Sequence, residues 1–153
     1  MFKYCLWLLI DDTHVIEKNK KIARLLNTSS FIPHVTIHHS LETPISYHHL
    51  KRPREILIVG EPYCSMAPII DNNDINHIFY SIEQRVFFPE APKVKAHISL
   101  AYRVDEEPFE IQDLFQITAR SLDLKNTRVK KRKLKIRLAN CFDTNPTKWY
   151  IIN

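Results

Sequence analysis

Two four-residue strings in this chain share one pattern: a histidine, an apolar residue, a hydroxyl residue and a second apolar residue. The first string, HVTI, begins at His34, and the second, HISL, begins at His97. Side chains two positions apart in a strand point to the same face, so each string places an imidazole beside a hydroxyl group. Because histidine titrates near neutral pH, one imidazole can accept a proton while the other donates one. With Thr36 and Ser99 donating to an anionic group, this is the chemistry of phosphodiester cleavage without a metal.

Composition narrows the kinds of phosphate site that the chain can build. The 153 residues suit one domain with a substantial core, and 44% of them are hydrophobic. A single glycine excludes glycine-rich phosphate loops and dinucleotide fingerprints, which need several glycines close together. The formal net charge of +5 favours an anionic partner. A phosphate group would therefore have to be held by side chains.

The cysteines and the apolar segments indicate a reducing, cytoplasmic compartment. Cys5, Cys64 and Cys141 are odd in number and widely spaced, which argues against a disulfide framework or a cysteine zinc site. The apolar run over residues 5–10 leads directly into two aspartates, so it predicts a buried strand and not a signal peptide. No run is long enough to span a bilayer, and we expect no membrane partner.

Periodicity predicts strands and helices in alternation. We expect strands at 4–10, 31–38, 55–59, 93–102, 129–139 and 148–152, and helices at 13–27 and 110–122. A short helix is possible at 44–50, residues 62–73 are rich in turn formers, and 77–84 fits a strand or a helix. A strand, a helix and a strand occur in order twice, each time with one histidine string. This order predicts an α+β protein of two similar lobes around a cleft.

Other polar clusters have ordinary structural explanations. A single His-x-hydroxyl string also fits an alternating strand, and the pattern alone does not decide between catalysis and coincidence. His38 lies on the strand face of His34, but the histidine pairs at 38–39 and 48–49 lack the spacing of a zinc site and are expected on the surface. The basic run over residues 128–137 fits a solvated sheet face slightly better than a face that lines the cleft and attracts a polyanion.

The two strings and their flanks resemble the 2H phosphoesterase superfamily, which is named for two His-x-Thr/Ser tetrapeptides. The similarity is closest to the cyclic phosphodiesterase branch known from plants and fungi. Residues 4–7 (YCLW) resemble its first strand, 31–36 (FIPHVT) its first motif, and 97–102 (HISLAY) its second motif. Residues 138–141 (LANC) with 148–149 (KW) resemble its closing hairpin, whereas 39–90 match poorly.

This resemblance implies one domain over residues 1–153, bilobal and α+β, with two antiparallel-sheet lobes, helices outside and both motifs at the floor of a central cleft. His34 and His97 would be the acid–base pair, and Thr36 and Ser99 would bind phosphate. Tyr102 would contact phosphate or sugar, although strict alternation places it on the other face from Ser99 unless a bulge or strand end turns its ring. Trp7 would stack on a base or close the pocket, and it also fits a packing role.

The activity that the resemblance implies is hydrolysis of a cyclic phosphate on a nucleotide, without metal or other cofactor. The substrate would be a nucleoside 2′,3′-cyclic phosphate or ADP-ribose 1″,2″-cyclic phosphate. Other branches cleave 2′,5′-oligoadenylate, process RNA ends or hydrolyse cyclic oligonucleotides, and a non-catalytic nucleotide- or RNA-binding module is a further alternative. We expect a monomer that binds a small nucleotide or a short oligonucleotide. The sequence does not determine the substrate, or which histidine is the acid.

Overall fold

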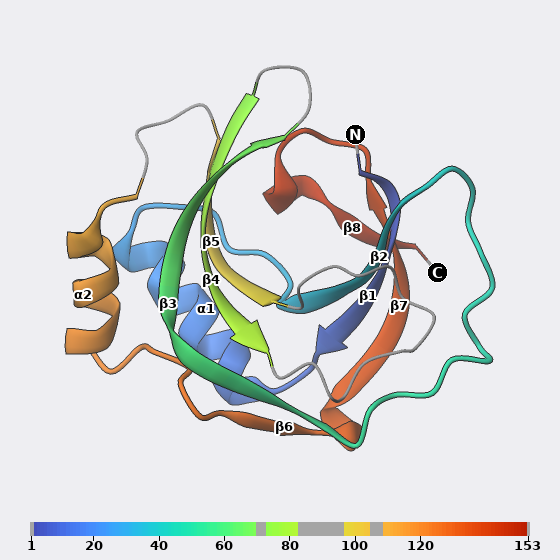
Figure 1. Cartoon of the computed structure of the whole chain (residues 1–153), viewed down its shortest axis with the longest axis horizontal. Helices are drawn as coiled ribbons and strands as arrows, with labels where there is room; N and C mark the ends of the chain where they lie inside the picture. Colours follow the sequence, from blue (N-terminus) through green and yellow to red (C-terminus); the bar gives the residue numbers. More distant parts are fainter. Residues whose placement is uncertain (1, 70–72, 83–96, 105–108, 153) are drawn as a thin grey trace.

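The computed structural model describes residues 2–69, 73–82, 97–104 and 109–152, and it is an α+β protein with antiparallel strands, as expected. Its two helices and its strands follow one another along the chain as shown in Figure 1. The strands are β1 (Lys3–Ile10), β2 (His34–Leu41), β3 (Glu55–Ile69), β4 (Asn73–Ile82), β5 (His97–Val104), β6 (Arg128–Lys130), β7 (Leu134–Cys141) and β8 (Tyr150–Ile152). The helices are α1 (Thr13–Leu25) and α2 (Ile111–Ala119), and the short 3₁₀ turns are η2 (Lys131–Lys133) and η3 (Pro146–Lys148).

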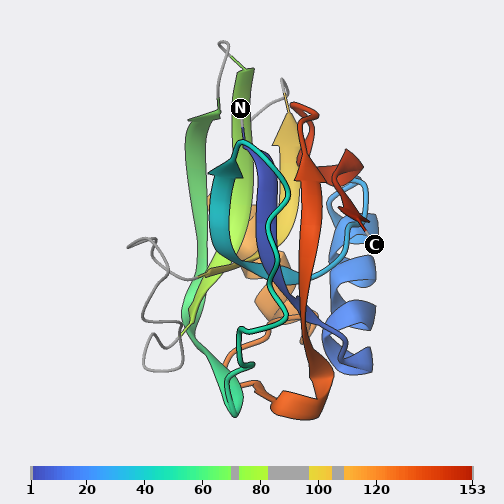
Figure 2. The same ribbon diagram turned by 90° about the vertical axis from the view of Figure 1, so that its right-hand side faces the viewer.

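The strands pair side by side in the order β6, β3, β4, β5, β2, β1, β7, β8. The sheet is strongly curved in Figure 1, and Figure 2 shows α1 lying along one side of it. The two strands that begin with the histidine strings, β2 and β5, are neighbours at the middle of this order. Their aligned residues are Val35 and Ile98. Segments far apart in the chain therefore meet at the histidine strings.

The two faces of the sheet bury different side chains. Alternate residues of the strands, such as Leu8 and Ile98, pack with Ile22 of α1 and Ile117 of α2 in the main core. The opposite face, which we call the site face, carries Trp7 and a smaller cluster on β1, β7 and β8. This smaller cluster consists of Cys5, Trp7, Leu9, Ala139 and Cys141, with Phe2, Trp149 and Ile151 packed against it. Cys5 and Cys141 are free thiols, and their mutual hydrogen bond together with burial raises the pKa of Cys141.

Helix α1 begins and ends at capping residues. The side chain of Asp12 accepts a hydrogen bond from the backbone N–H of Val15 at 3.1 Å, which satisfies one of the free donors of the first turn. The helix ends two residues earlier than predicted because Asn27 adopts a left-handed φ of 55°. One buried position of α1 is polar. Asn19 is 2% exposed, and its amide donates to the backbone carbonyl of Leu100 on β5 at 3.1 Å.

Strand β5 contains a bulge at the residue that Asn19 contacts. In the pairing with β4, Ile78 is opposite Ala101 and Phe79 is opposite Ser99, so Leu100 is an extra residue. Leu100 and Ala101 are both buried in the main core. The bulge therefore reverses the alternation of β5 beyond Ser99.

One prediction about the middle of the chain was wrong, and one open question is settled there. Residues 62–73 were expected to form turns, but β3 continues to Ile69 and β4 starts at Asn73. Proline has no N–H to donate, so a strand accepts it only where no neighbouring strand needs that hydrogen bond. Beyond Leu57, no strand of the described residues pairs with the outer side of β3, so Pro62 and Pro68 lie on an edge. The undecided segment at 77–84 is strand β4 as far as Ile82, and its last two residues lie outside the described residues.

Two further expectations also need correction. No helix forms at 44–50. The strand predicted over 129–139 is divided by η2, because β6 pairs with β3 whereas β7 pairs with β1 on the other half of the sheet. The remaining predicted strands and helices are present with shifted ends, except that 93–96 lies outside the described residues. Neither α1 nor α2 has the length and apolar character needed to cross a bilayer.

Replacement of Asn19 by leucine should destabilise the fold, because it leaves the buried carbonyl of Leu100 without its donor. A buried acceptor left unpaired costs about 1–3 kcal/mol. Urea denaturation should therefore show a lower free energy of unfolding for Asn19→Leu, with an exposed neighbour, Lys20→Leu, as the matched control. Equal midpoints for Asn19→Leu and the wild type would contradict a structural role for this bond.

Candidate active site

The sheet brings both histidines and both hydroxyl residues onto one face of two adjacent strands. Because Val35 and Ile98 are aligned in an antiparallel pair, the same register sets His34 opposite Ser99 and Thr36 opposite His97. Val35 and Ile98 are fully buried in the main core. Their neighbours therefore face the other way, onto the site face. The predicted catalytic and phosphate-binding residues thus form one compact group of four.

His34 is held in one orientation by its own backbone. The imidazole is 8% exposed, and its Nδ1 lies 2.7 Å from the carbonyl oxygen of Ile32. A carbonyl only accepts, so Nδ1 carries the hydrogen and donates it, which assigns the tautomer. The second ring nitrogen, Nε2, then carries the lone pair of the neutral imidazole. This nitrogen is available to take a proton.

Trp7 covers one face of the same imidazole ring. The two rings are stacked with their centroids 3.8 Å apart and their planes 15° from parallel. Trp7 is 2% exposed and aligns with Thr36 in the pairing of β1 with β2. Its buried indole N–H has no hydrogen-bond partner among the described residues. Trp7 is therefore both a packing residue and a direct neighbour of His34.

Burial makes His34 a neutral group. Its pKa is lowered from 6.5 to about 4, chiefly by desolvation and to a lesser extent by the charge of His97, against the opposing effect of the hydrogen bond to the carbonyl of Ile32. His34 is consequently uncharged at neutral pH. His97 is only half-buried, and its ring meets that of Phe79 edge to face at 5.4 Å. The two imidazoles thus occupy different environments although their sequence strings match.

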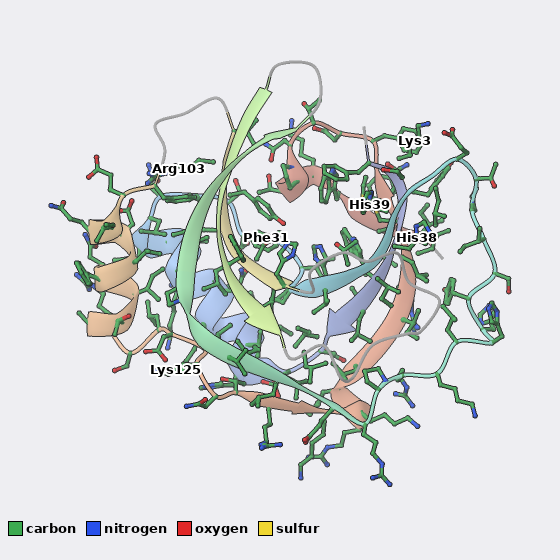
Figure 3. The ribbon with its side chains drawn as sticks, in the orientation of Figure 1. Lys3, Phe31, His38, His39, Arg103 and Lys125 are labelled. Carbon is green, nitrogen blue, oxygen red and sulfur yellow. The ribbon has the colours of Figure 1, made fainter. Side chains whose placement is uncertain are left out.

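The bulge in β5 places Tyr102 with the site residues. Strict alternation would put this ring on the core face, but the extra residue Leu100 returns it to the face of Ser99. The hydroxyl of Tyr102 is hydrogen-bonded to the side chain of Ser99, and burial raises the pKa of Tyr102 to about 12. The phenol is therefore protonated and can donate. Its ring lies 4.8 Å from that of Phe31, which Figure 3 shows inside the curve of the sheet and which the sequence did not single out.

His38, His39 and the histidines at 48–49 do not join this group. The register of β2 slips after Thr36, so His38 aligns with Leu6, a residue of the main core. His38 therefore does not share the sheet face of His34, although the two residues are an even number of positions apart. The ring of His39 meets that of Phe2 edge to face, with the ring centroids 5.8 Å apart. Figure 3 shows His38 and His39 on β2. The histidines at 48–49 are exposed, and the described residues contain no group of three or more side chains able to hold a metal ion.

Two cations on β7 also belong to the site face, and sequence reasoning did not place them there. Arg137 aligns with Trp7 across the β1–β7 pair, and Lys135 aligns with Leu9. Lys135 forms an ion pair with Asp11 at 2.9 Å, whereas Arg137 makes none with a described residue and donates to the carbonyl of Ile136. Alternation along residues 134–138 shows that these cations share a face. Only the pairing of β7 with β1 shows that this face is the one with the histidines.

No model of a known protein family matches this chain, and no curated protein matches it. The geometry of the site is therefore the basis for inferring its chemistry.

The low pKa of His34 predicts a specific loss of stability in acid. Between pH 6.5 and about 4 the unfolded chain takes up a proton that the folded His34 does not, so the free energy of unfolding falls as the pH falls through this range. The contribution amounts to about 3 kcal/mol. Urea denaturation at a series of pH values should show this component in the wild type and not in His34→Gln. The same pH dependence in both proteins would be inconsistent with a buried, neutral His34.

Proposed function

We propose that the protein is a metal-independent phosphodiesterase of the 2H type, which opens a cyclic phosphate on a nucleotide. The single observation that carries this proposal is the group of four formed by the register of β2 and β5. Two imidazoles and two hydroxyls face the same side, and one imidazole is buried and neutral. Separated general acid and base groups around hydrogen-bond donors suit the cleavage of a phosphate ester.

In this proposal His34 is the general base. Its Nε2 removes a proton from a water molecule, and the water oxygen attacks the phosphorus atom. His97 is the general acid, and its imidazolium protonates the ribose oxygen whose bond to phosphorus breaks. The half-buried position of His97 leaves its charged form in contact with solvent. The product is a phosphate monoester with a free ribose hydroxyl, and no metal takes part.

The hydroxyl residues would stabilise the negative charge that grows on the phosphate oxygens. Thr36 and Ser99 lie opposite the two histidines, and the protonated phenol of Tyr102 is hydrogen-bonded to Ser99. Three aimed donors in a partly buried site are worth more than the same donors in water. Arg137 adds a positive charge one strand beyond Trp7. These groups replace the glycine-rich loop that the composition excludes.

The substrate that we propose first is a nucleoside 2′,3′-cyclic phosphate or ADP-ribose 1″,2″-cyclic phosphate. Trp7, which is stacked on His34, would then border the base or the sugar. Cleavage of 2′,5′-oligoadenylate or of a cyclic dinucleotide uses the same acid–base pair and remains the alternative. The bilobal arrangement around a cleft, and the action of the protein as a monomer in the cytoplasm, are parts of the same proposal.

The test of this function is a panel of these four substrate classes, with the product phosphates resolved as 2′ or 3′ monoesters. One class should be hydrolysed, and His34→Ala and His97→Ala should each lower kcat/KM about 100-fold or more. The exposed His48→Ala is the matched control and should retain full activity. Addition of EDTA should leave the rate unchanged. Loss of activity with EDTA and its return with zinc or manganese would overturn the mechanism, and nucleotide binding without turnover of any substrate would favour the binding module.

The assignment of His34 as the base predicts the acid side of the pH profile. A base works only when unprotonated, and the pKa of His34 is lowered to about 4. We therefore expect kcat/KM for the hydrolysed substrate to hold as the pH falls through 6.5 and to decline only towards about pH 4. A half-maximal rate near pH 6.5 on the acid side would assign the base to a solvated histidine instead.

A further inference from the structure

The segment that interrupts the predicted basic strand forms a corner with an unusual concentration of positive charge. The chain turns through η2 between β6 and β7, and the residues before β3 run alongside it. Figures 1 and 2 both place β6 and η2 at one end of the molecule. We call this surface the basic corner, and its members are Lys51, Arg52, Arg54, Lys130, Lys131, Arg132 and Lys133.

Backbone and side-chain hydrogen bonds hold the two segments of the basic corner together. The N–H of Lys131 donates to the carbonyl of Arg54 at 2.8 Å. The guanidinium of Arg52 donates to the carbonyl of Lys131 at 3.2 Å and to that of Leu134 at 3.1 Å. These bonds fix the backbone of both segments. Every member except Lys133 is exposed, and Lys133 is half-buried.

The charge of the basic corner is not neutralised within the described protein. The adjacent Arg128 is paired with Glu55 at 2.6 Å and is therefore not counted as a member. No carboxylate of the described residues lies within ion-pair distance of any of the seven members. Like charges so close together repel one another, and an external polyanion would remove that repulsion.

Strand β7 connects the basic corner to the candidate active site. It begins directly after η2, and its site face carries Lys135 and then Arg137, about 7 Å apart along the strand. In the pairing across β1, Lys135 lies in the row of His34 and Arg137 in the row of Thr36. Lys135 is paired with Asp11 at 2.9 Å, so Arg137 is the cation that continues from the corner to the rows of the site residues without an ion pair to a described residue.

We propose that the basic corner and the site face of β7 bind the phosphate backbone of a single-stranded nucleic acid, whose end then reaches the histidine pair. The cleavage of the nucleic acid end at the histidines rests on the proposed function, whereas the binding of its phosphate backbone to the basic corner does not. A membrane surface fits the corner less well, because peripheral membrane binding combines cations with inserted apolar side chains. The exposed large apolar side chains of the described residues all lie elsewhere, at Ile32, Ile45, Ile111, Phe115, Phe142 and Tyr150.

The test compares two triple variants that remove the same charge from different surfaces. One is Lys130→Gln, Lys131→Gln and Arg132→Gln in the corner, and the other is Lys20→Gln, Lys21→Gln and Arg24→Gln on the exposed side of α1. Both are made in a His97→Ala background so that the probe is not cleaved. The probe is a fluorescently labelled single-stranded oligouridylate, and its dissociation constant is measured over a range of salt concentrations.

The corner variant should weaken binding and lower the slope of log affinity against log salt by about 2, because each cation contributes about 0.7 for a single strand. The α1 variant should bind as its parent does. Equal weakening by both variants, or binding of anionic phospholipid vesicles in preference to the oligouridylate, would overturn the proposal. Loss of binding in the corner variant alone, in a protein that hydrolyses none of the four substrate classes, would support the docking surface and reject the proposed phosphodiesterase activity.

Discussion

One buried hydrogen bond links the helical layer to the geometry of the site. The extra residue in β5 turns Tyr102 onto the face of Ser99, but it also takes the carbonyl of Leu100 out of the regular ladder. Asn19 of α1 supplies the missing donor from the opposite side of the sheet. The buried face of α1 is otherwise apolar, and the bulge in β5 explains why Asn19 is present on it. The packing of α1 and the position of the Tyr102 phenol are consequently coupled.

The environment of His34 serves both stability and reactivity. The stacked Trp7 and the surrounding strands exclude water from the imidazole, and this exclusion is what keeps it uncharged. The carbonyl of Ile32 then selects which nitrogen bears the hydrogen. His97 has the same sequence context but less burial and an edge contact from Phe79. Two equal strings therefore give two unequal imidazoles, and the difference comes from the strands that flank them.

The sequence was sufficient where the structure follows local periodicity, and insufficient where distant strands decide. Alternation placed the two strings on strands and assigned the face of each hydroxyl. It did not reveal the extra residue at Leu100, because a bulge depends on the register with β4. The prolines at 62 and 68 suggested turns, but they are tolerated on the unpaired side of β3. The break at η2 was equally hidden, since basic and apolar residues alternate through it and only the partners of β6 and β7 require the chain to turn.

The edge of the sheet formed by β3 has a consequence for association between copies of the chain. A long edge strand offers a row of donors and acceptors to any other extended segment, and such edges promote aggregation. Pro62 and Pro68 lie in the part of β3 whose outer side no strand of the described residues covers, and neither has an N–H to donate to an added strand. The same residues that obscured the strand in the sequence therefore act as gatekeepers against uncontrolled strand addition.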